Sequence, residues 1–385
     1  MKLFDVYPLF NITPVKGEGI YLYDEAGNKY MDLYGGHAVI SIGHSHPHYV
    51  NKLTTQLQQL GFYSNSVKIP QQQELADKLG ALSGYNDYEL FLCNSGAEAN
   101  ENALKLASFH NGRKKVIAFQ KSFHGRTSLA VAATNDASIQ APVNKAHDIA
   151  FLPFNDHEAF INAMNDEVCA VIIEGIQGVG GVHVPEAGFL KLLREKCTEY
   201  GAVLILDEIQ SGYGRSGYFF AHQYAGITAD LITVAKGMGN GFPVAGVLIN
   251  PMFKARYGLL GTTFGGNYLA CAAAIAVLDV IAEENLIDNA RETGNYLMQQ
   301  LAHFDEVKEI RGLGMMIGIE LHQPADTIRK HLLTAHHIFT GSASNKNTLR
   351  ILPPLTITKA EVDVFLTAFQ SSLKALNYES LHIGA

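Results

Sequence analysis

Three short apolar runs end in a charged residue: AVIIEG (170–175), AVLILDE (202–208) and LITVAKG (231–237). They belong to a series of seven runs that alternates with segments of helical spacing: Leu90–Cys93, Val116–Phe119, Ile149–Leu152, Ala170–Ile173, Ala202–Leu206, Leu231–Ala235 and Gly246–Ile249. Continuous apolar runs of this length are typical of strands that are buried on both faces. Their alternation with helices predicts an α/β fold around a mostly parallel, seven-stranded sheet.

The flanking sequence predicts a second, smaller unit. Residues 20–34 hold two alternating apolar runs around Asp24–Asn28, which is typical of a β-hairpin. Helical spacing occurs at His48–Leu60, Gln71–Leu82 and Tyr268–Glu283, and strand-like runs occur at 310–321 and 348–357. Because 385 residues exceed what one core supports, we expect a large domain at 51–270 and a small α/β domain formed by 1–50 with 271–385.

The composition excludes some classes of protein. With a net charge of −8 the chain offers no basic stripe for nucleic acid. No apolar stretch is long enough to span a bilayer, and the first residues lack the apolar core of a secretory leader, so we expect a cytoplasmic protein without membrane contact. The cysteines have no paired spacing, which indicates reduced thiols: Cys93, Cys169, Cys197 and Cys271.

Charged residues directly after buried strands are candidates for a site, because open α/β sheets bind ligands at the carboxyl ends of their strands. Glu174, Asp207 and Lys236 hold these positions. An acid and a lysine at one crevice suit pyridoxal 5′-phosphate (PLP), whose aldehyde condenses with an unprotonated lysine and whose pyridine nitrogen needs an acidic partner. Burial would lower the pKa of the lysine in the required direction. We therefore predict that Lys236 carries PLP and that Asp207 pairs with the ring.

Two further motifs could complete such a site. CNSGAEANENALKLA (93–107) passes from a strand into a strong helix, and the N-terminus of a helix favours a phosphate. Ser95 would cap this helix and Gly96 would admit the phosphate, although an ordinary capped helix would show the same pattern. In FHGRT (123–127), Phe123 could cover the ring and Arg126 could pair with a substrate carboxylate. A surface turn would carry the same residues.

These residues resemble the class III (subgroup II, fold-type I) PLP aminotransferases, and among them the acetylornithine and succinylornithine aminotransferases. The resemblance covers essentially the whole chain. Its motifs occur in the order of the family: GEGIYLYDEAGNKYMDLYGG (17–36), NSGAEANENALKLA (94–107), FHGRT (123–127), ILDEIQSGYGRSG (205–217), AKGMGNGFPVAG (235–246), GTTFGGN (261–267) and LRILPPL (349–355). It implies transfer of the ω-amino group of an N-acylornithine to 2-oxoglutarate in arginine biosynthesis.

The resemblance assigns a role to each matching residue. In the cofactor site, Lys236 would form the Schiff base, Asp207 would meet the pyridinium, and Gln210 would lie near the phenolic oxygen of the ring. Phe123 would stack on the ring. Three residues would bind the phosphate: Gly96 and Ala97 through their backbone N–H groups, and Thr263 from the neighbouring subunit. The last role implies a homodimer with the site at the subunit interface.

For the substrates, Arg126 with Thr262 resembles the pair that binds the α-carboxylate of the acylornithine. Arg350 resembles the arginine that takes the α-carboxylate of glutamate. The sequence departs from the family in EGIQGVGG (174–181), where Gly175 replaces a proline and Val179 replaces a glutamate. In relatives this glutamate can shield the second arginine while the amine is bound. Its loss leaves Arg350 permanently available or paired elsewhere.

Other functions were weighed against this one. Within the family, free ornithine or 4-aminobutyrate could be the donor, but Arg126 favours an acylated substrate with an α-carboxylate. A dehydrogenase would need GxGxxG after the first strand, where it is absent, and a binding protein would not need both Lys236 and Asp207. The histidines form no closed set of metal ligands, so we expect no metal: His37, His44, His46, His48, His336 and His337.

Overall fold

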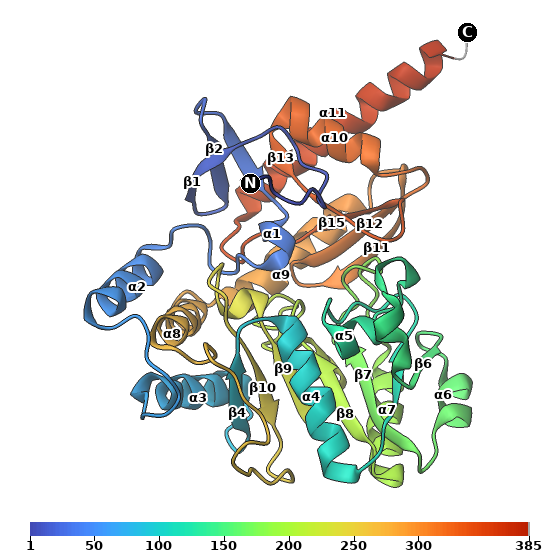
Figure 1. Cartoon of the computed structure of the whole chain (residues 1–385). Helices are drawn as coiled ribbons and strands as arrows, with labels where there is room; N and C mark the ends of the chain where they lie inside the picture. Colours follow the sequence, from blue (N-terminus) through green and yellow to red (C-terminus); the bar gives the residue numbers. More distant parts are fainter. Residues whose placement is uncertain (384–385) are drawn as a thin grey trace.

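A computed structural model describes residues 1–383, and a seven-stranded sheet lies at the centre of this part of the chain (Figure 1). The strands are β4 (Glu89–Cys93), β5 (Lys115–Phe119), β6 (Ile149–Leu152), β7 (Val168–Glu174), β8 (Val203–Asp207), β9 (Leu231–Val234) and β10 (Ala245–Ile249). Their order is β4-β10-β9-β8-β7-β5-β6, with β10 antiparallel to β4 and β9 and parallel pairing from β9 to β6. Each strand overlaps one predicted run, so the mostly parallel sheet is confirmed.

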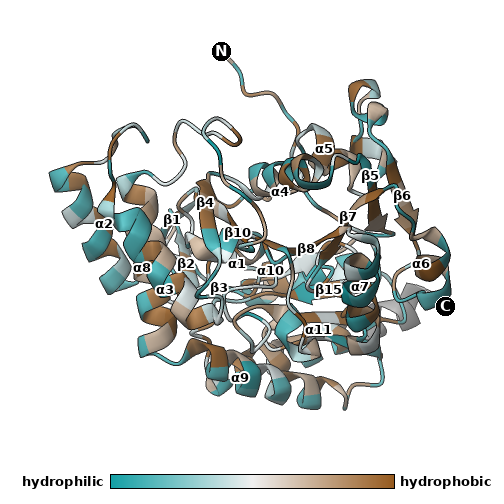
Figure 2. Cartoon of the chain, turned by 90° about the horizontal axis from the view of Figure 1, so that it is seen from below, coloured by the Kyte–Doolittle hydropathy of each residue, from teal (hydrophilic) through white to brown (hydrophobic). Residues whose placement is uncertain are grey.

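Helices cover both faces of this sheet. The helices beside it are α3 (Pro70–Ser83), α4 (Gly96–Asn111), α5 (Ser128–Ala132), α6 (His157–Ala163) and α7 (Ala187–Tyr200). Alternate residues of β8 enter different cores: Val203 and Ile205 pack in a cluster with α4, whereas Leu204 and Leu206 pack in a cluster with α7. This alternation explains why the strand is apolar throughout, since neither face meets water. In Figure 2 the strands are mostly brown, the colour of apolar residues.

Two four-stranded sheets lie above the large sheet in the described part of the chain (Figure 1). One consists of β1 (Pro14–Glu18), β2 (Tyr21–Asp24), β3 (Lys29–Asp32) and β13 (Ile338–Phe339); the other consists of β11 (Val307–Leu313), β12 (Met316–Leu321), β15 (Thr348–Ile351) and β14 (Gly341–Ser342). Strands β2 and β3 form the predicted hairpin, whose loop is held by the carboxylate of Asp24. Parallel pairing of Ile338 with Met31 joins the two ends of the chain in one sheet.

The remaining helices connect these layers. They are α1 (Gly35–Ala38), α2 (Pro47–Gln59), α8 (Tyr268–Glu283), α9 (Leu286–Leu301), α10 (Asp326–His336) and α11 (Lys359–Ile383), with short 3-10 helices at Ala137–Ile139, Pro142–Ala146, Ala221–Ala225 and Lys236–Met238. Helix α8 has the predicted bounds and packs against α2 and α3. The predicted domain limits at residues 50 and 270 fall inside α2 and α8, and the division itself stays a prediction. None of the described helices is long and apolar enough to cross a membrane.

Candidate active site

A cavity of about 380 Å³ lies at the carboxyl ends of β7, β8 and β9. Glu174, Asp207 and Lys236 all line it, so the structure brings together the three charged residues that the sequence placed after buried strands. Glu174 and Asp207 are partners in the register of β7 and β8. Lys236 follows β9, the next strand of the sheet. Parallel strands therefore deliver two acids and one amine to the same opening.

Asp207 is held by three hydrogen bonds. Its Oδ2 accepts from His124 Nδ1 and from Asn100 Nδ2, both at 2.8 Å, and its Oδ1 accepts from the backbone N–H of Ile209 at 3.1 Å. Asn100 is fixed in turn, because its Oδ1 accepts from Thr233 Oγ1 at 2.8 Å. The carboxylate is thus anchored from β8, from α4 and from the loop after β5.

Sequence reasoning missed Asn100 and His124. Both lie inside quoted motifs, and both are fully buried, with 0% and 2% of their surface exposed. In the sequence, Asn100 is a polar residue on the apolar face of a predicted helix, and His124 is a histidine next to Phe123. Neither pattern predicts the hydrogen-bond partner, because Asn100 and Asp207 are 107 positions apart.

Lys236 sits in a strained backbone position, with φ of 46° at the start of a 3-10 helix. Burial lowers the pKa of its amine, and the negative charges of Asp207 and Glu174 oppose this shift. Non-glycine residues rarely adopt positive φ, and such strain is concentrated at functional sites. A lowered pKa supplies the neutral amine that a nucleophilic lysine needs.

Glu174 also belongs to the site, although its position at the end of β7 predicted no particular role for it. Its Oε1 accepts from the N–H of Phe123 and its Oε2 accepts from the N–H of Gly178, both at 3.0 Å. Burial raises the pKa of the Glu174 carboxyl to about 7, and the charge of Asp207 acts in the same direction. Glu174 therefore ties the loop that carries Phe123 to the loop that follows β7.

The start of α4 forms one end of the cavity. Ser95 caps this helix, because its Oγ accepts from the N–H of Glu98 at 3.2 Å, and Gly96 and Ala97 line the cavity. A Cβ on Gly96 would come within 2.9 Å of two carbons of Ile209, so this position has room only for glycine. N–H groups in the first turn lack partners within the helix and favour an anion.

These features fit PLP. The cavity combines a lysine with lowered pKa, an anchored carboxylate, a close-packed glycine at a helix start and the half-buried ring of Phe123. Among the described residues, no group of three or more His, Cys, Asp or Glu could hold a metal ion.

The structure places the threonines outside this chain's own cavity. Thr262 Oγ1 accepts from Asn94 Nδ2 at 3.3 Å and from the N–H of Gly265 at 3.1 Å, which shapes the glycine-rich loop. Thr263 is exposed on the surface of the single chain. Neither threonine lines the cavity.

The two predicted substrate arginines differ in their surroundings. Arg126 lines the cavity and is exposed, whereas Arg350 is 3% exposed and lies behind Gln210. Arg350 Nη1 contacts Gln210 Oε1 at 3.5 Å, and Gln210 Nε2 donates to the carbonyl oxygen of His37 at 3.0 Å. Val179 lines the cavity at the position where the sequence lacks the acid of the family. Gln210 therefore separates the cofactor region from Arg350.

Comparisons with known proteins agree with this geometry. The model of the family "Aminotransferase class-III" matches residues 5–373. An acetylornithine aminotransferase of Bacillus subtilis is 40% identical, with 94% of each chain covered, and one of Archaeoglobus fulgidus is 38% identical, with 94% of this chain and 95% of the relative covered. The crystal structure of an ornithine aminotransferase from Toxoplasma gondii matches with a TM-score of 0.91 at 28% identity, covering 97% of this chain and 92% of that one.

The fold and site define a fold-type I aminotransferase. The chain belongs to the class III aminotransferase family, as the resemblance of its motifs predicted.

Proposed function

We propose that the protein transfers the ω-amino group of an N2-acylornithine, acetylornithine or succinylornithine, to 2-oxoglutarate and uses PLP bound to Lys236. The products are an N-acylglutamate 5-semialdehyde and L-glutamate. The observation that carries this proposal is the convergence of Lys236, Asp207 and the start of α4 on a cavity with Arg126 at its wall. The names of the 37–40% identical relatives support the acylated donor.

When bound, PLP supplies an aldehyde for the amino group and a ring that takes up electrons. Lys236 would hold the aldehyde, and its amine, once displaced by the substrate amine, would be placed to take and return a proton at the reacting carbon. Burial suits this work, because it lowers the pKa of Lys236 and so favours the neutral amine.

Asp207 has the acceptor capacity for a protonated ring nitrogen. A carboxylate offers about four acceptor positions. Three of them are used by His124, Asn100 and the N–H of Ile209. The position that is left on Oδ1 would accept the ring N–H. The other donors keep the carboxylate oriented, and Phe123, which lines the cavity, would cover the ring.

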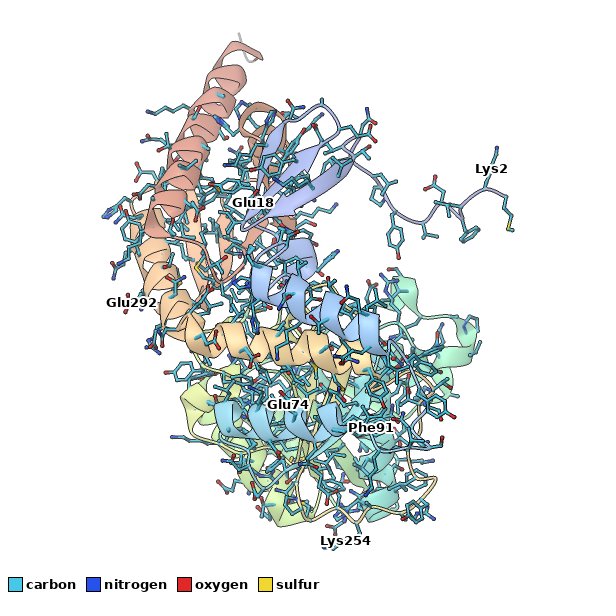
Figure 3. All side chains as sticks on the ribbon, turned by 90° about the vertical axis from the view of Figure 1, so that its left-hand side faces the viewer. Lys2, Glu18, Glu74, Phe91, Lys254 and Glu292 are labelled. Atoms are coloured by element: carbon cyan, nitrogen blue, oxygen red, sulfur yellow. The ribbon has the colours of Figure 1, made fainter. Side chains whose placement is uncertain are left out.

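The N–H groups of Gly96 and Ala97 would bind the phosphate, and Thr263 of the partner subunit would complete its shell. Thr263 is exposed, and its neighbour Phe264 contacts Phe62 in a tilted ring pair with centroids 5.4 Å apart. Their exposed fractions are 59% and 42%. In Figure 3 the segment marked by Lys2 projects away from the body, and its neighbours Leu3 and Phe4 are exposed. Apolar surface of this extent supports a homodimer.

The substrate carboxylates are bound by arginines. Arg126 with Thr262 takes the α-carboxylate of the acylornithine, and Arg350 takes the α-carboxylate of glutamate. Gln210, which contacts Arg350, would lie between this arginine and the ring, near the phenolic oxygen. With an acylated ornithine as its donor, the enzyme would act in arginine biosynthesis, in the cytoplasm.

A half-reaction assay tests the proposal. The PLP-loaded protein is mixed with one donor at a time, and the spectrum of the cofactor reports amine transfer. Acetylornithine or succinylornithine should discharge the cofactor at least ~10 times faster than free ornithine or 4-aminobutyrate. Free ornithine brings a charged α-amine that is costly to bury, and 4-aminobutyrate has no acylated α-nitrogen and a chain one carbon shorter between its amine and its carboxylate. Glutamate should also react. A faster reaction with free ornithine or 4-aminobutyrate would overturn the acylornithine assignment and favour the alternative donor.

A further inference from the structure

The carboxyl group of Glu174 is a buried acid that the proposed transfer does not use. It lines the cavity at the end of β7 and is 6% exposed. Burial raises its pKa to about 7; the charge of His124 acts against burial, and the charge of Asp207 acts with it. The charge of Glu174 in turn opposes the effect of burial on the pKa of Lys236. Glu174 therefore changes its charge near neutral pH, inside the cavity.

A short chain of contacts joins Glu174 to Arg350. Glu174 Oε2 accepts from the N–H of Gly178 at 3.0 Å. Gln210 packs closely against Gly178, because a Cβ on this glycine would overlap the amide oxygen of Gln210. The same amide oxygen contacts Arg350 Nη1 at 3.5 Å. Glu174 and the guanidinium group of Arg350 are thus connected through Gly178 and Gln210.

Around Arg350, Glu174 is the group whose charge changes near pH 7. Burial lowers the pKa of Arg350, the charges of Tyr34 and Glu174 oppose this shift, and Arg329 acts with burial. Burial raises the pKa of Tyr34 above its ordinary value of 10.0, so the phenol is neutral at pH 7. Burial, followed by the charge of Arg350, lowers the pKa of His37 below its ordinary value of 6.5, so the imidazole is also neutral. Glu174 therefore supplies negative charge to Arg350 that depends on pH.

The proposed substrates differ in the charge that they bring to Arg350. The α-carboxylate of the acylated donor goes to Arg126, and Val179 adds no charge to the cavity wall. Glu174 then balances Arg350. Glutamate brings a carboxylate to Arg350 itself, so two carboxylates would act on one guanidinium group. A buried charge without a partner is costly, and protonation of Glu174 removes this cost.

We propose that Glu174 is the counter-charge of Arg350: its carboxylate balances the guanidinium group while an acylated donor is bound, and it takes up a proton from solvent when glutamate binds. The two carboxylate oxygens each accept one N–H, from Phe123 and from Gly178, and a carboxylate has about four acceptor positions. The proton therefore bonds to one oxygen while both loops stay attached, and no other bond changes. This inference rests on the assignment of Arg126 and Arg350 in the proposed function.

Calorimetry with glutarate tests the proton uptake. Glutarate has the two carboxylates of glutamate and no amine, so it binds to the PLP-loaded protein without reacting. Titrations in buffers of different ionisation enthalpy give the number of protons taken up. With a pKa of about 7 in the free protein and about tenfold coupling between proton and ligand, the uptake should be about 0.4 proton at pH 7. The Kd of glutarate should rise about fivefold from pH 6 to pH 8.

Substitutions identify the acid that takes up the proton. Glu174→Gln should remove this uptake and the rise of Kd, whereas Glu174→Asp, which keeps an acid, should retain both. Glu208→Gln is the matched control, because Glu208 is a buried acid that is bonded to His222 and Ser211 and does not line the cavity. Its uptake should equal that of the unmodified protein. Equal uptake in Glu174→Gln and in the unmodified protein would overturn the role of Glu174.

A ligand with one carboxylate completes the test. N2-acetyl-L-norvaline lacks the ω-amine and places its carboxylate at Arg126, so it should bind without proton uptake. Equal uptake with both ligands would overturn the role of Glu174, and so would glutarate that binds without uptake or does not bind at pH 6. These measurements do not depend on the donor. If free ornithine discharges the cofactor faster than acylornithine while glutarate still causes uptake at Glu174, the acylornithine assignment fails and the role of Glu174 stands.

Discussion

The two walls of the cavity are built differently. On the wall that faces the cofactor, Asp207 accepts three hydrogen bonds, and Gly96 is packed so closely that no Cβ fits. On the substrate side, Arg126 lines the cavity and is exposed, and Arg350 lies behind Gln210 with one short bond to a carbonyl and one contact of 3.5 Å. A cofactor stays bound through both half-reactions, so its residues can be fixed in advance. Substrates alternate, so their arginines must stay free to change partners.

The difference predicts which half-reactions each substitution damages. Changes on the cofactor wall should slow the reactions with the acylornithine and with glutamate equally. Changes on the substrate wall should alter one of them. The following predictions test this division, beginning with the largest effect.

Replacement of Lys236 by alanine should abolish transfer. Loss of the amine removes both the covalent attachment and the acid-base group, and we expect at least a ~10³-fold slower discharge with either substrate. Mass spectrometry after borohydride reduction should find no PLP attached to the variant. A reducible adduct at another lysine would show that the assignment of Lys236 is wrong.

Asp207→Asn should slow both half-reactions by about 100-fold, because an amide cannot keep the ring nitrogen protonated. Glu208→Gln is the control for the adjacent acid. The carboxylate of Glu208 is bonded to His222 Nδ1 and Ser211 Oγ, so its loss should lower the melting temperature and change kcat/KM by less than about threefold. Similar kinetics for the two variants would contradict the role of Asp207.

Gly96→Ala should weaken PLP binding by about 10- to 100-fold, because the added methyl would meet Ile209 at 2.9 Å and overpacking costs about 1–3 kcal/mol. Fluorescence titration of the apoprotein gives the Kd. Ile209→Ala in the same chain should restore part of the affinity. Unchanged binding in the single variant would show that the start of α4 can move away from Ile209.

Val179→Glu should affect one half-reaction only. The carbonyl oxygen of Val179 accepts from the N–H of Ser344, close to Ser342, which holds Arg350. An acid there can pair with Arg350 and compete with glutamate, and a partly exposed pair is worth about 1 kcal/mol, or about fivefold in kcat/KM. Val179→Gln is the neutral control. An equal loss with both substrates would contradict the division between the walls.

Glu174 should affect the stability of the apoprotein rather than the rate of transfer. Burial raises the pKa of its carboxyl from 4.5 to about 7, so the folded chain keeps a proton that the unfolded chain releases in this range. Its contribution to the free energy of unfolding should therefore decrease as pH rises from 4.5 to 7, by about 3 kcal/mol at most. Glu174→Gln should flatten this part of the pH profile of the melting temperature. Parallel profiles would show that Glu174 is charged throughout.

The sequence was more informative about the cofactor wall than about the substrate wall. The residues of the cofactor wall follow buried strands or begin a capped helix, and these positions can be recognised from local pattern, as at Asp207, Lys236 and Gly96. Asn100 and His124 were not predicted, because their role depends on a buried hydrogen bond to Asp207. Asn100 is 107 positions from Asp207 in the sequence and His124 is 83 positions from it. The two adjacent acids of AVLILDE have different surroundings: Asp207 faces the cavity, whereas Glu208 packs against His222. The local sequence does not predict which of the two enters the cavity.

The sequence by itself determined the sheet, because seven apolar runs buried on both faces need no partner to be recognised. It also determined the family, through motifs that span the chain. Only the tertiary structure decided which charges lack a partner. Whether Val179 left Arg350 paired elsewhere depended on strands and helices that are distant in sequence: packing brings the Tyr34 ring to its guanidinium, and the carboxylate of Glu174 also acts on its charge. Whether a charged side chain is neutralised depends on the residues that surround it in space, and the spacing of residues along the chain does not predict these neighbours.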